Sequence, residues 1–230
     1  MKKQEKFVKP AQFAEQEIIK NIVSNKWSVG QSLLPERELA DFLGITRPTL
    51  REVLQRLSRD GWITIKHGRP TIINDYLENG GLGILRSLVS NNEISSNILV
   101  RDWLEFRVLL LPDLAFKAIQ YNKEDVLKIL DHIPNLNATA EEFSSFDWYL
   151  QFSLVKLSKN MIAKMLFNDI AEIYNKESKF YFKKKRNKEL SLAYYNKLKR
   201  SILGDRTKIK KYVKQVMLIS LKLWEKDNNI

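Results

Sequence analysis

Arginine and threonine side chains cluster at the start of one predicted helix in the N-terminal third of the chain. Thr46, Arg47, Thr49 and Arg51 lie in one short stretch, and Arg37 belongs to the helix just before it. The planar fork of arginine matches O6 and N7 of guanine together, which makes arginine the usual reader of that base. The second helix of a helix-turn-helix enters the major groove with its N-terminal residues against base edges. The pattern therefore predicts that these five side chains contact DNA.

A second candidate contact is the tight turn formed by His67, Gly68 and Arg69. Gly68 permits the turn and a close approach of the backbone, and Arg69 suits the negative potential of a narrow minor groove. We predict that this turn touches phosphates or the minor groove. The alternative for His67 is an ordinary solvated loop residue.

The arginines of the helix also have simpler interpretations. Arg47 and Arg51 share one helix face, and each could instead form an ordinary salt bridge with Glu38 or Glu52. Two further arginines on the same helix are interpreted as phosphate contacts or plain surface charges, namely Arg56 and Arg59.

The elements that position these side chains follow from apolar spacing and helix breakers. A helix is predicted over about 11–26 and a short one over 36–43, which Gly44 ends because glycine tolerates a left-handed C-cap. Thr46 caps the next helix. The buried stripe of that helix follows the i, i+3, i+4, i+7 spacing at Leu50, Val53, Leu54 and Leu57.

A short β-hairpin is predicted after these helices. Residues 62–66 and 71–73 are rich in branched and aromatic side chains, and 67–70 form the turn between them. Two helices joined by a glycine turn and followed by a hairpin make a winged helix-turn-helix. We assign this DNA-binding domain to residues 1–75.

The rest of the chain is predicted to be a linker followed by a helical bundle. Glycines over 79–83 place the linker at 76–83. Over 84–230 the spacing is helical throughout, which predicts an all-α domain for ligand sensing and dimerisation and makes the whole chain mostly α. Its last helix includes residues 216–224, which are apolar almost all the way round, so we expect this helix to be central and buried.

The composition favours a folded cytoplasmic protein and excludes several kinds of site. Hydrophobic residues make up 44% and charged residues 29%. The chain has no cysteine, which excludes disulfides, thiolate metal sites and a cysteine nucleophile. No signal peptide and no membrane-spanning stretch is predicted, so no membrane partner is expected. His67 and His132 are the two histidines, which cannot supply a three-histidine site, so no metal is expected.

The positive charge is unevenly distributed. The formal net charge is +12, yet residues 1–78 carry thirteen Lys/Arg against ten Asp/Glu, a net of +3. Residues 176–214 carry fifteen against three, a net of +12. The basic excess therefore lies mainly outside the predicted DNA-binding domain. A nucleic acid, a phosphate-bearing ligand and simple solubility are all compatible with it.

Five motifs in the first third of the chain resemble the GntR superfamily of transcriptional regulators, and within it the regulators of fatty acid metabolism. They are PEREL (35–39), GITR (44–47), TLREVLQRL (49–57), RDGWITI (59–65) and HGRPT (67–71). The resemblance implies a homodimer on double-stranded DNA with a palindromic operator. It places the five side chains of the helices on DNA and the His-Gly wing tip in the minor groove. Pro48 departs from the pattern, which has a hydroxyl residue there.

The resemblance also implies an effector, long-chain acyl-CoA, which would lie along the last helix. The matching positions are Arg107, Tyr181, Tyr195, Met217, Ser220 and Trp224. The aromatic run 180–182 would line an apolar tunnel, and the basic stretch 183–188 could serve the phosphates. The family has glycine at Met217, so the larger side chain could narrow the passage. The alternative is a packed core helix beside a solvated basic face.

The leading functional prediction is a dimeric regulator of fatty acid metabolism genes that long-chain acyl-CoA releases from DNA, with no tightly bound cofactor. The alternative keeps the same DNA-binding mode with a different ligand or none. An enzyme is not expected, because the sequence has no nucleophile elbow, acyl-transfer motif or phosphate-binding loop.

Overall fold

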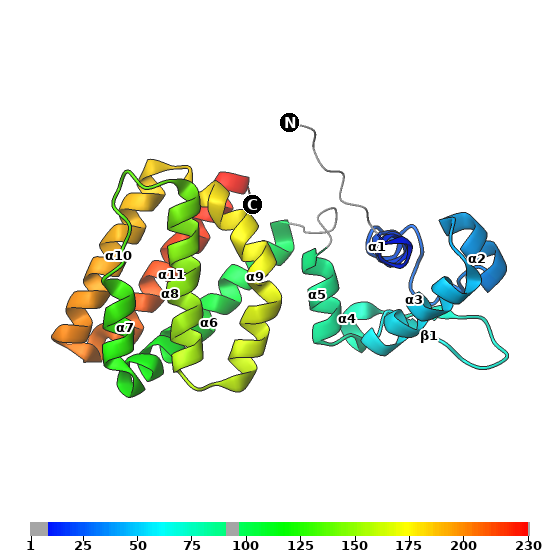
Figure 1. Cartoon of the computed structure of the whole chain (residues 1–230), viewed down its shortest axis with the longest axis horizontal. Helices are drawn as coiled ribbons and strands as arrows, with labels where there is room; N and C mark the ends of the chain where they lie inside the picture. Colours follow the sequence, from blue (N-terminus) through cyan, green and yellow to red (C-terminus); the bar gives the residue numbers. More distant parts are fainter. Residues whose placement is uncertain (1–8, 91–96, 230) are drawn as a thin grey trace. The chain divides into compact units, whose positions relative to one another are not determined.

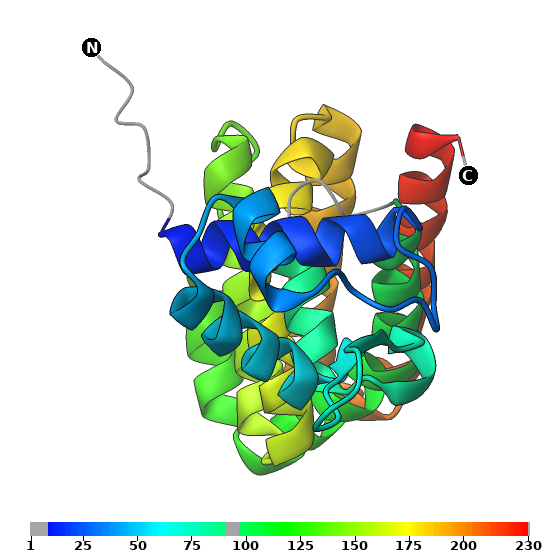
Figure 2. The same cartoon turned by 90° about the vertical axis from the view of Figure 1, so that its right-hand side faces the viewer.

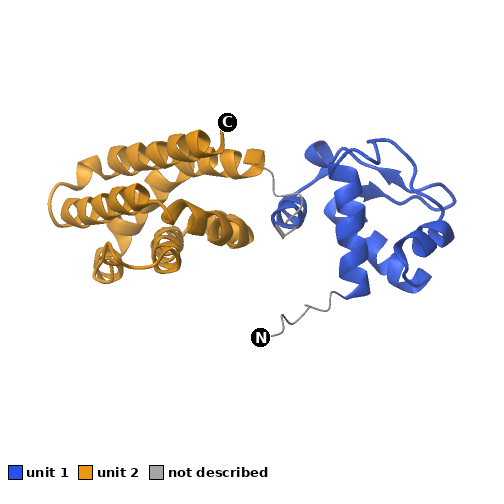
Figure 3. Cartoon of the chain, turned by 90° about the horizontal axis from the view of Figure 1, so that it is seen from above, with its two compact units in different colours: residues 1–95 blue, residues 96–230 orange. Residues whose placement is uncertain are grey.

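The computed structural model describes residues 9–90 and 97–229. By their internal contacts the residues form two compact units, unit 1 (1–95) and unit 2 (96–230), which Figure 3 colours separately. In the described part of the chain, no helix has both the length and the apolar character needed to cross a membrane.

Three helices form the centre of unit 1. They are α1 (Pro10–Val23), α2 (Glu36–Leu43) and α3 (Arg47–Asp60), and α3 packs against both of the others (Figures 1 and 2). The apolar face of α3 is buried at the four predicted positions, which confirms the stripe that begins at Leu50. Gly44 ends α2 in the left-handed conformation with φ 65°, as predicted.

The predicted hairpin is present but shorter than expected. Strand β1 (Ile63–Thr64) pairs antiparallel with β2 (Ile72–Ile73), and Ser32 adds an isolated bridge to Ile72. Side chains from Ile65 to Pro70 are exposed, so the strands end where the core no longer covers them. The winged helix-turn-helix is thereby confirmed.

The predicted linker at 76–83 is wrong, because most of this stretch is helical and belongs to unit 1. Helices α4 (Tyr76–Asn79) and α5 (Leu82–Ser90) follow the hairpin, and Ile84 is buried in the core of unit 1. The glycines that suggested flexibility allow close packing instead. A Cβ on Gly80 would lie 2.3 Å from a side-chain carbon of Ile84, and one on Gly83 would lie 3.0 Å from Asp60.

Unit 2 is all-helical over its described residues, as predicted. Its elements are α6 (Asn97–Tyr121), α7 (Lys123–Leu130), α8 (Ala140–Leu157), α9 (Met161–Phe182), α10 (Lys185–Leu203), the 3-10 turn η1 (Arg206–Lys208) and α11 (Ile209–Asn228). Helix α6 packs against α8 and α11, and α8 packs against α9 (Figure 1). These four helices, together with α10, enclose the candidate ligand cavity.

The last helix is buried on one face only, which corrects the expectation that 216–224 is central and buried. Met217, Leu221 and Trp224 are buried, whereas Leu218 and Ile219 are 36% and 45% exposed. Leu218 therefore faces away from the core, whereas Ile219 lies at the wall of the candidate ligand cavity.

Gly61 provides a test of how α4 is fixed in unit 1. It ends α3 with φ 101°, and an added Cβ would lie 2.7 Å from the carbonyl oxygen of Asn79. We expect Gly61→Ala to lower the opening free energy of unit 1 by about 1–3 kcal/mol. Native-state hydrogen exchange of the α3 amides measures this opening separately from unit 2.

The matched control is Gly81→Ala, because a Cβ at Gly81 meets nothing within 4 Å. Equal exchange rates in the two variants would contradict the strain and contact assigned to Gly61.

Candidate nucleic-acid interface and ligand cavity

The start of α3 is held by a threonine cap. The backbone amide of Thr49 donates to Oγ1 of Thr46 at 3.4 Å, and the two hydroxyls lie 2.9 Å apart. This cap fixes the first turn of the helix from which the candidate base contacts project. Thr46 is exposed and Thr49 half-buried, so both predicted contact residues lie at the surface.

The three arginines predicted to read bases are all exposed. Arg37 belongs to the first turn of α2, while Arg47 and Arg51 belong to the first turns of α3. The buried stripe of α3 leaves these side chains on its outer side. Their placement is the one a groove-reading helix requires, and the base contacts themselves stay predictions.

Arg51 forms a salt bridge, although not with the expected glutamates. Its Nε lies 2.8 Å from Oε2 of Glu36, with side chains that are 62% and 40% exposed. An exposed pair of this kind contributes only about 0–1 kcal/mol, so DNA can displace it. The hydrogen bond uses Nε alone, and the Arg51 side chain stays largely exposed. Within the described residues, Arg47 forms no ion pair.

The wing tip has the predicted geometry. Gly68 has φ 67°, in the left-handed region, and the amide of Arg69 donates to the carbonyl of Lys66 at 3.2 Å. His67, Gly68 and Arg69 are all exposed. The turn is therefore open to a partner, and whether that partner is DNA stays a prediction.

The other two arginines of α3 differ in their surroundings. Arg56 Nε lies 3.0 Å from Oε2 of Glu15 in α1, so it ties two helices of unit 1 together. Arg59 has a side chain that is 73% exposed, at the far end of α3 from the base-reading residues. Arg59 is therefore the better candidate for a surface charge that is available to phosphates.

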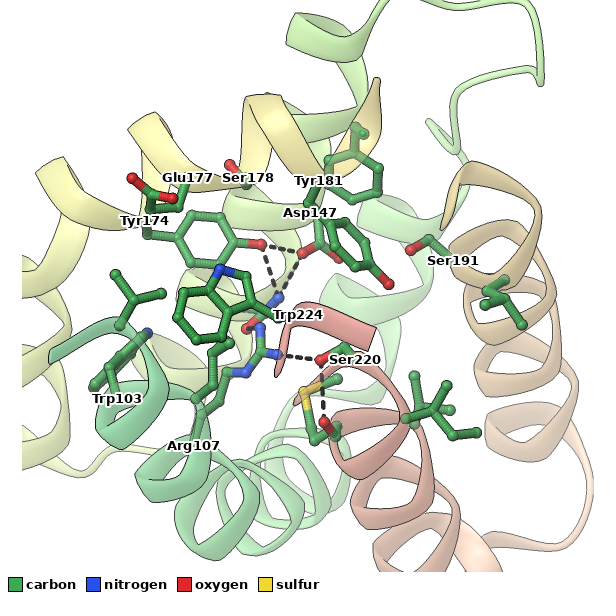
Figure 4. A pocket seen from close by; sticks show the side chains of 18 of the residues that line it. Trp103, Arg107, Asp147, Tyr174, Glu177, Ser178, Tyr181, Ser191, Ser220 and Trp224 are labelled. Carbon is green, nitrogen blue, oxygen red and sulfur yellow. Dashed lines mark hydrogen bonds between the residues drawn. The ribbon is translucent and has the colours of Figure 1, made fainter. Parts of the chain in front are cut away.

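Unit 2 contains a largely apolar cavity between α6, α8, α9, α10 and α11 (Figure 4). The space open to the centres of water molecules is about 80 Å³. Its apolar wall includes Val100, Trp103, Ile173, Phe182 and Met217. Among the described residues, no group of three or more histidines and carboxylates is placed to hold a metal ion.

A buried guanidinium projects into this cavity. Arg107 is 4% exposed, and its Nη1 donates to Oε1 of Gln151 at 3.2 Å while Nη2 donates to Oγ of Ser220 at 2.5 Å. Its Nε is buried and has no hydrogen-bond partner among the described residues. Figure 4 shows the guanidinium directed at Ser220 in the middle of the pocket.

A buried carboxylate supplies the countercharge through shared hydrogen bonds. Asp147 accepts from Nε2 of Gln151 at 2.6 Å, from the hydroxyl of Tyr195 at 2.7 Å and from the hydroxyl of Tyr174. Burial and the neighbouring Asp147 raise the pKa of Tyr174 and Tyr195 well above the usual value. Both tyrosines are therefore protonated donors at neutral pH.

The cavity brings together five of the six residues assigned to the ligand. Arg107, Tyr181, Met217, Ser220 and Trp224 line it. Tyr181 is largely buried, which raises its pKa to about 12. The sixth residue, Tyr195, is not part of the wall and instead supports Asp147 from behind.

One further expectation for the ligand is wrong, and another stays a prediction. Phe180 is 57% exposed and does not line the cavity, although Tyr181 and Phe182 do. The basic stretch 183–188 also lies outside the wall, and Lys184 forms an ion pair with Asp227 at 2.7 Å instead. Helix α9 ends at Phe182, between the aromatic run 180–182 and the basic stretch 183–188, so the two runs do not continue on one helix face.

Sequence reasoning missed the acceptors of the buried network. Asp147 and Gln151 lie on one face of α8 at i, i+4, inside an otherwise apolar stretch. A carboxylate on a buried helical face was the available signal. Tyr174 carried no such signal, because its role depends on the packing of α9 against α8.

Comparisons with known proteins divide the chain in a similar way. The model for bacterial regulatory proteins of the gntR family matches residues 10–73. The model for the FadR C-terminal domain matches residues 74–229, and thus includes α4 and α5, which pack in unit 1.

Two curated relatives carry the same name. The fatty acid metabolism regulator protein of Shewanella frigidimarina is 38% identical over 192 residues, which cover 83% of this chain and 80% of that protein. The protein of the same name from Shewanella amazonensis is 34% identical over 221 residues, which cover 94% of this chain and 91% of that protein. A solved structure of Lar, which controls the agr system of Listeria monocytogenes, has a TM-score of 0.59 at 14% identity and covers 96% and 99% of the two chains. That likeness concerns the fold alone.

The exposed arginines generate a test of base reading. We expect Arg37→Ala, Arg47→Ala and Arg51→Ala each to weaken binding to a cognate site by about 1–3 kcal/mol, with much smaller losses on random DNA. A salt-titrated binding assay on both DNAs measures this difference.

The matched control is Arg59→Ala, which removes an exposed charge at the other end of α3. This variant should weaken binding to both DNAs alike or not at all. Equal losses on cognate and random DNA for the first three variants would reject their assignment as base readers.

Proposed function

The chain belongs to the GntR family of bacterial regulatory proteins, in the group with a FadR C-terminal domain, and on this premise we propose that long-chain acyl-CoA releases it from its operator. It is a transcriptional regulator of fatty acid metabolism, as are the relatives it matches, and not an enzyme. Binding to a palindromic site as a homodimer is the other part of the proposal.

The DNA-binding part is supported by the geometry of unit 1. A capped helix presents Arg47 and Arg51 at its exposed start, and Arg37 approaches from the preceding helix. The wing tip at Gly68 is exposed at the end of the hairpin. Since the frame beneath them is a packed apolar core, these side chains are offered to DNA without rearrangement of the backbone.

The ligand part is carried by one observation, a cavity with an apolar wall and a buried arginine inside it. An acyl chain needs apolar contacts, and Val100, Ile173 and Met217 supply them. A thioester and its amide-containing extension need donors, and Arg107 has one unused donor at Nε. A cavity of this kind suits a ligand with a long apolar part and a few polar groups.

The cavity must open before a long chain can enter. About 80 Å³ of space holds roughly five to eight water molecules, so a chain of roughly sixteen carbons cannot fit without movement. Met217 is 3% exposed and lines the wall, so its displacement is one way to make room. Opening would couple binding to a change in helix positions, which regulation requires, because a ligand that binds both states equally shifts nothing.

Acyl-CoA release is tested by titration. We expect palmitoyl-CoA to lower the affinity of the protein for its operator, while free CoA and free palmitate have little effect. No change in affinity at roughly a hundred times a typical micromolar dissociation constant would reject acyl-CoA as the effector. That outcome would favour a regulator with a different ligand or none.

Met217→Ala separates a closed passage from a wrong ligand. The matched control is Leu218→Ala, because Leu218 is its neighbour on α11 but does not line the cavity. We expect Met217→Ala to respond to palmitoyl-CoA at lower concentration than the wild type, and Leu218→Ala to behave as the wild type does. Identical curves for all three proteins would show that Met217 does not limit entry.

The assembly is tested independently of the ligand. We expect sedimentation velocity at micromolar concentration to give twice the mass of the chain, and footprinting to protect a two-fold symmetric site. A symmetric dimer reads a symmetric site, with half-site centres one helical turn apart or a multiple of it. A monomer both with and without DNA would contradict the proposal.

A further inference from the structure

A second hollow in unit 2 lies at the end of the α10–α11 hairpin, and half of the residues that line it are basic. The space open to the centres of water molecules is about 480 Å³, far larger than that of the buried cavity. Helix α10, the turn η1 and helix α11 form its walls. We call this hollow the basic cleft, and its charged residues are Lys197, Arg200, Asp205, Lys208 and Lys211.

The positive charge of the basic cleft is mostly uncompensated. Four cations and one carboxylate line it, which gives a net charge of +3. Lys208 Nζ lies 3.2 Å from Oδ2 of Asp205. Lys197, Arg200 and Lys211 form no ion pair with any residue that the structure describes.

Some cations elsewhere in the same basic segment are neutralised by a carboxylate from another part of unit 2. Lys199 lies 2.7 Å from Asp131, and Lys210 lies 2.5 Å from Asp113. Lys197, Arg200 and Lys211, which have no carboxylate partner among the described residues, instead lie together where the surface is concave. Cations held close together on a rigid frame repel one another, and a bound anion removes that repulsion.

Tyr212 helps to hold these charges in place. Lys197 Nζ lies 4.1 Å from the centre of the Tyr212 ring, a cation–π contact. The same ring lies 5.9 Å from that of Tyr194, which lines the buried cavity. The basic cleft and the cavity are thus neighbours along α10 and α11, separated by a pair of aromatic rings.

We propose that the basic cleft binds the phosphate groups of a small polyphosphorylated ligand. The guanidinium of Arg200 matches two phosphate oxygens at once, and the lysines add point charges around it. A concave site with several cations favours adjacent phosphates over a single carboxylate. Two sources share this chemistry, namely a free nucleotide and the nucleotide end of a ligand whose other end occupies the cavity. The proposal does not depend on acyl-CoA being the effector.

The test is calorimetric titration of the full chain with ADP and with inorganic pyrophosphate. We expect saturable binding that weakens as salt is added. Arg200→Ala and Lys211→Ala should each weaken it about tenfold, as the loss of a charge-assisted contact predicts. The matched control is Lys214→Ala, which removes the same charge from an exposed position on α11 outside the basic cleft. It should stay within about twofold of the wild type.

Titration of free CoA into the same variants distinguishes the two sources. A parallel tenfold loss assigns the basic cleft to the nucleotide end of the coenzyme, and an unchanged CoA affinity assigns it to a separate nucleotide. Absence of saturable binding by ADP and pyrophosphate would overturn the proposal, as would an equal loss in Lys214→Ala. Operator binding by each variant checks that it is folded. The ADP result does not depend on acyl-CoA, so a failure of acyl-CoA to release DNA would not contradict phosphate binding in the basic cleft.

Discussion

The burial of Arg107 is the constraint on which unit 2 depends. A guanidinium keeps its charge under all ordinary conditions, so a buried one needs hydrogen-bond acceptors and a countercharge close by. Helix α8 supplies Gln151 and Asp147, and α11 supplies Ser220, which lies 113 positions away from Arg107 in the sequence. Three helices must therefore keep their register together, because sliding any one of them would leave a buried charge without its partner. Removing one partner of such a network costs several kcal/mol, whereas small shifts of an apolar contact cost little.

In the part of the chain that the structure describes, two polar groups in and beside this network have no hydrogen-bond partner, which leaves them available to a ligand. Arg107 Nε and the hydroxyl of Tyr194 are buried without partners among the described residues, and both belong to residues that line the cavity. An unmet buried donor costs about 1–3 kcal/mol, so a ligand with acceptors at these points recovers free energy that the unliganded protein lacks. Unit 1 shows the opposite arrangement. There the candidate contacts, such as Arg47 and Arg51, are exposed, and the frame beneath them is a packed apolar core.

Local patterns predicted unit 1 well and unit 2 only in outline. The glycine cap at Gly44, the threonine cap at Thr46 and the stripe on α3 depend on neighbours within one or two turns, and all three are present. Arg51 pairs with Glu36 and not with the expected Glu38 or Glu52, because helical spacing does not fix which residue of α2 faces Arg51 on α3. Asp147 and Tyr174 meet only through the packing of α8 and α9, which periodicity does not encode. Gly80 and Gly83 led to the wrong prediction of a linker at 76–83, because glycine is typical both of flexible linkers and of close packing contacts.

The packing of α5 has a consequence for how such regulators can be recombined. Ile84 completes the core around α3, and Tyr76 packs its ring 5.0 Å from that of Trp62 at the base of the wing. Consider a gene fusion that joins the DNA-binding domain to a foreign sensor domain at residue 75. It would remove the side chains of Tyr76 and Ile84 and expose Trp62. The DNA-binding domain that can be transferred intact extends through Ser90. The fusion junction suited to chimeric regulators therefore lies past the end of α5. Family boundaries drawn from sequence alone place the cut one helix pair too early for that purpose.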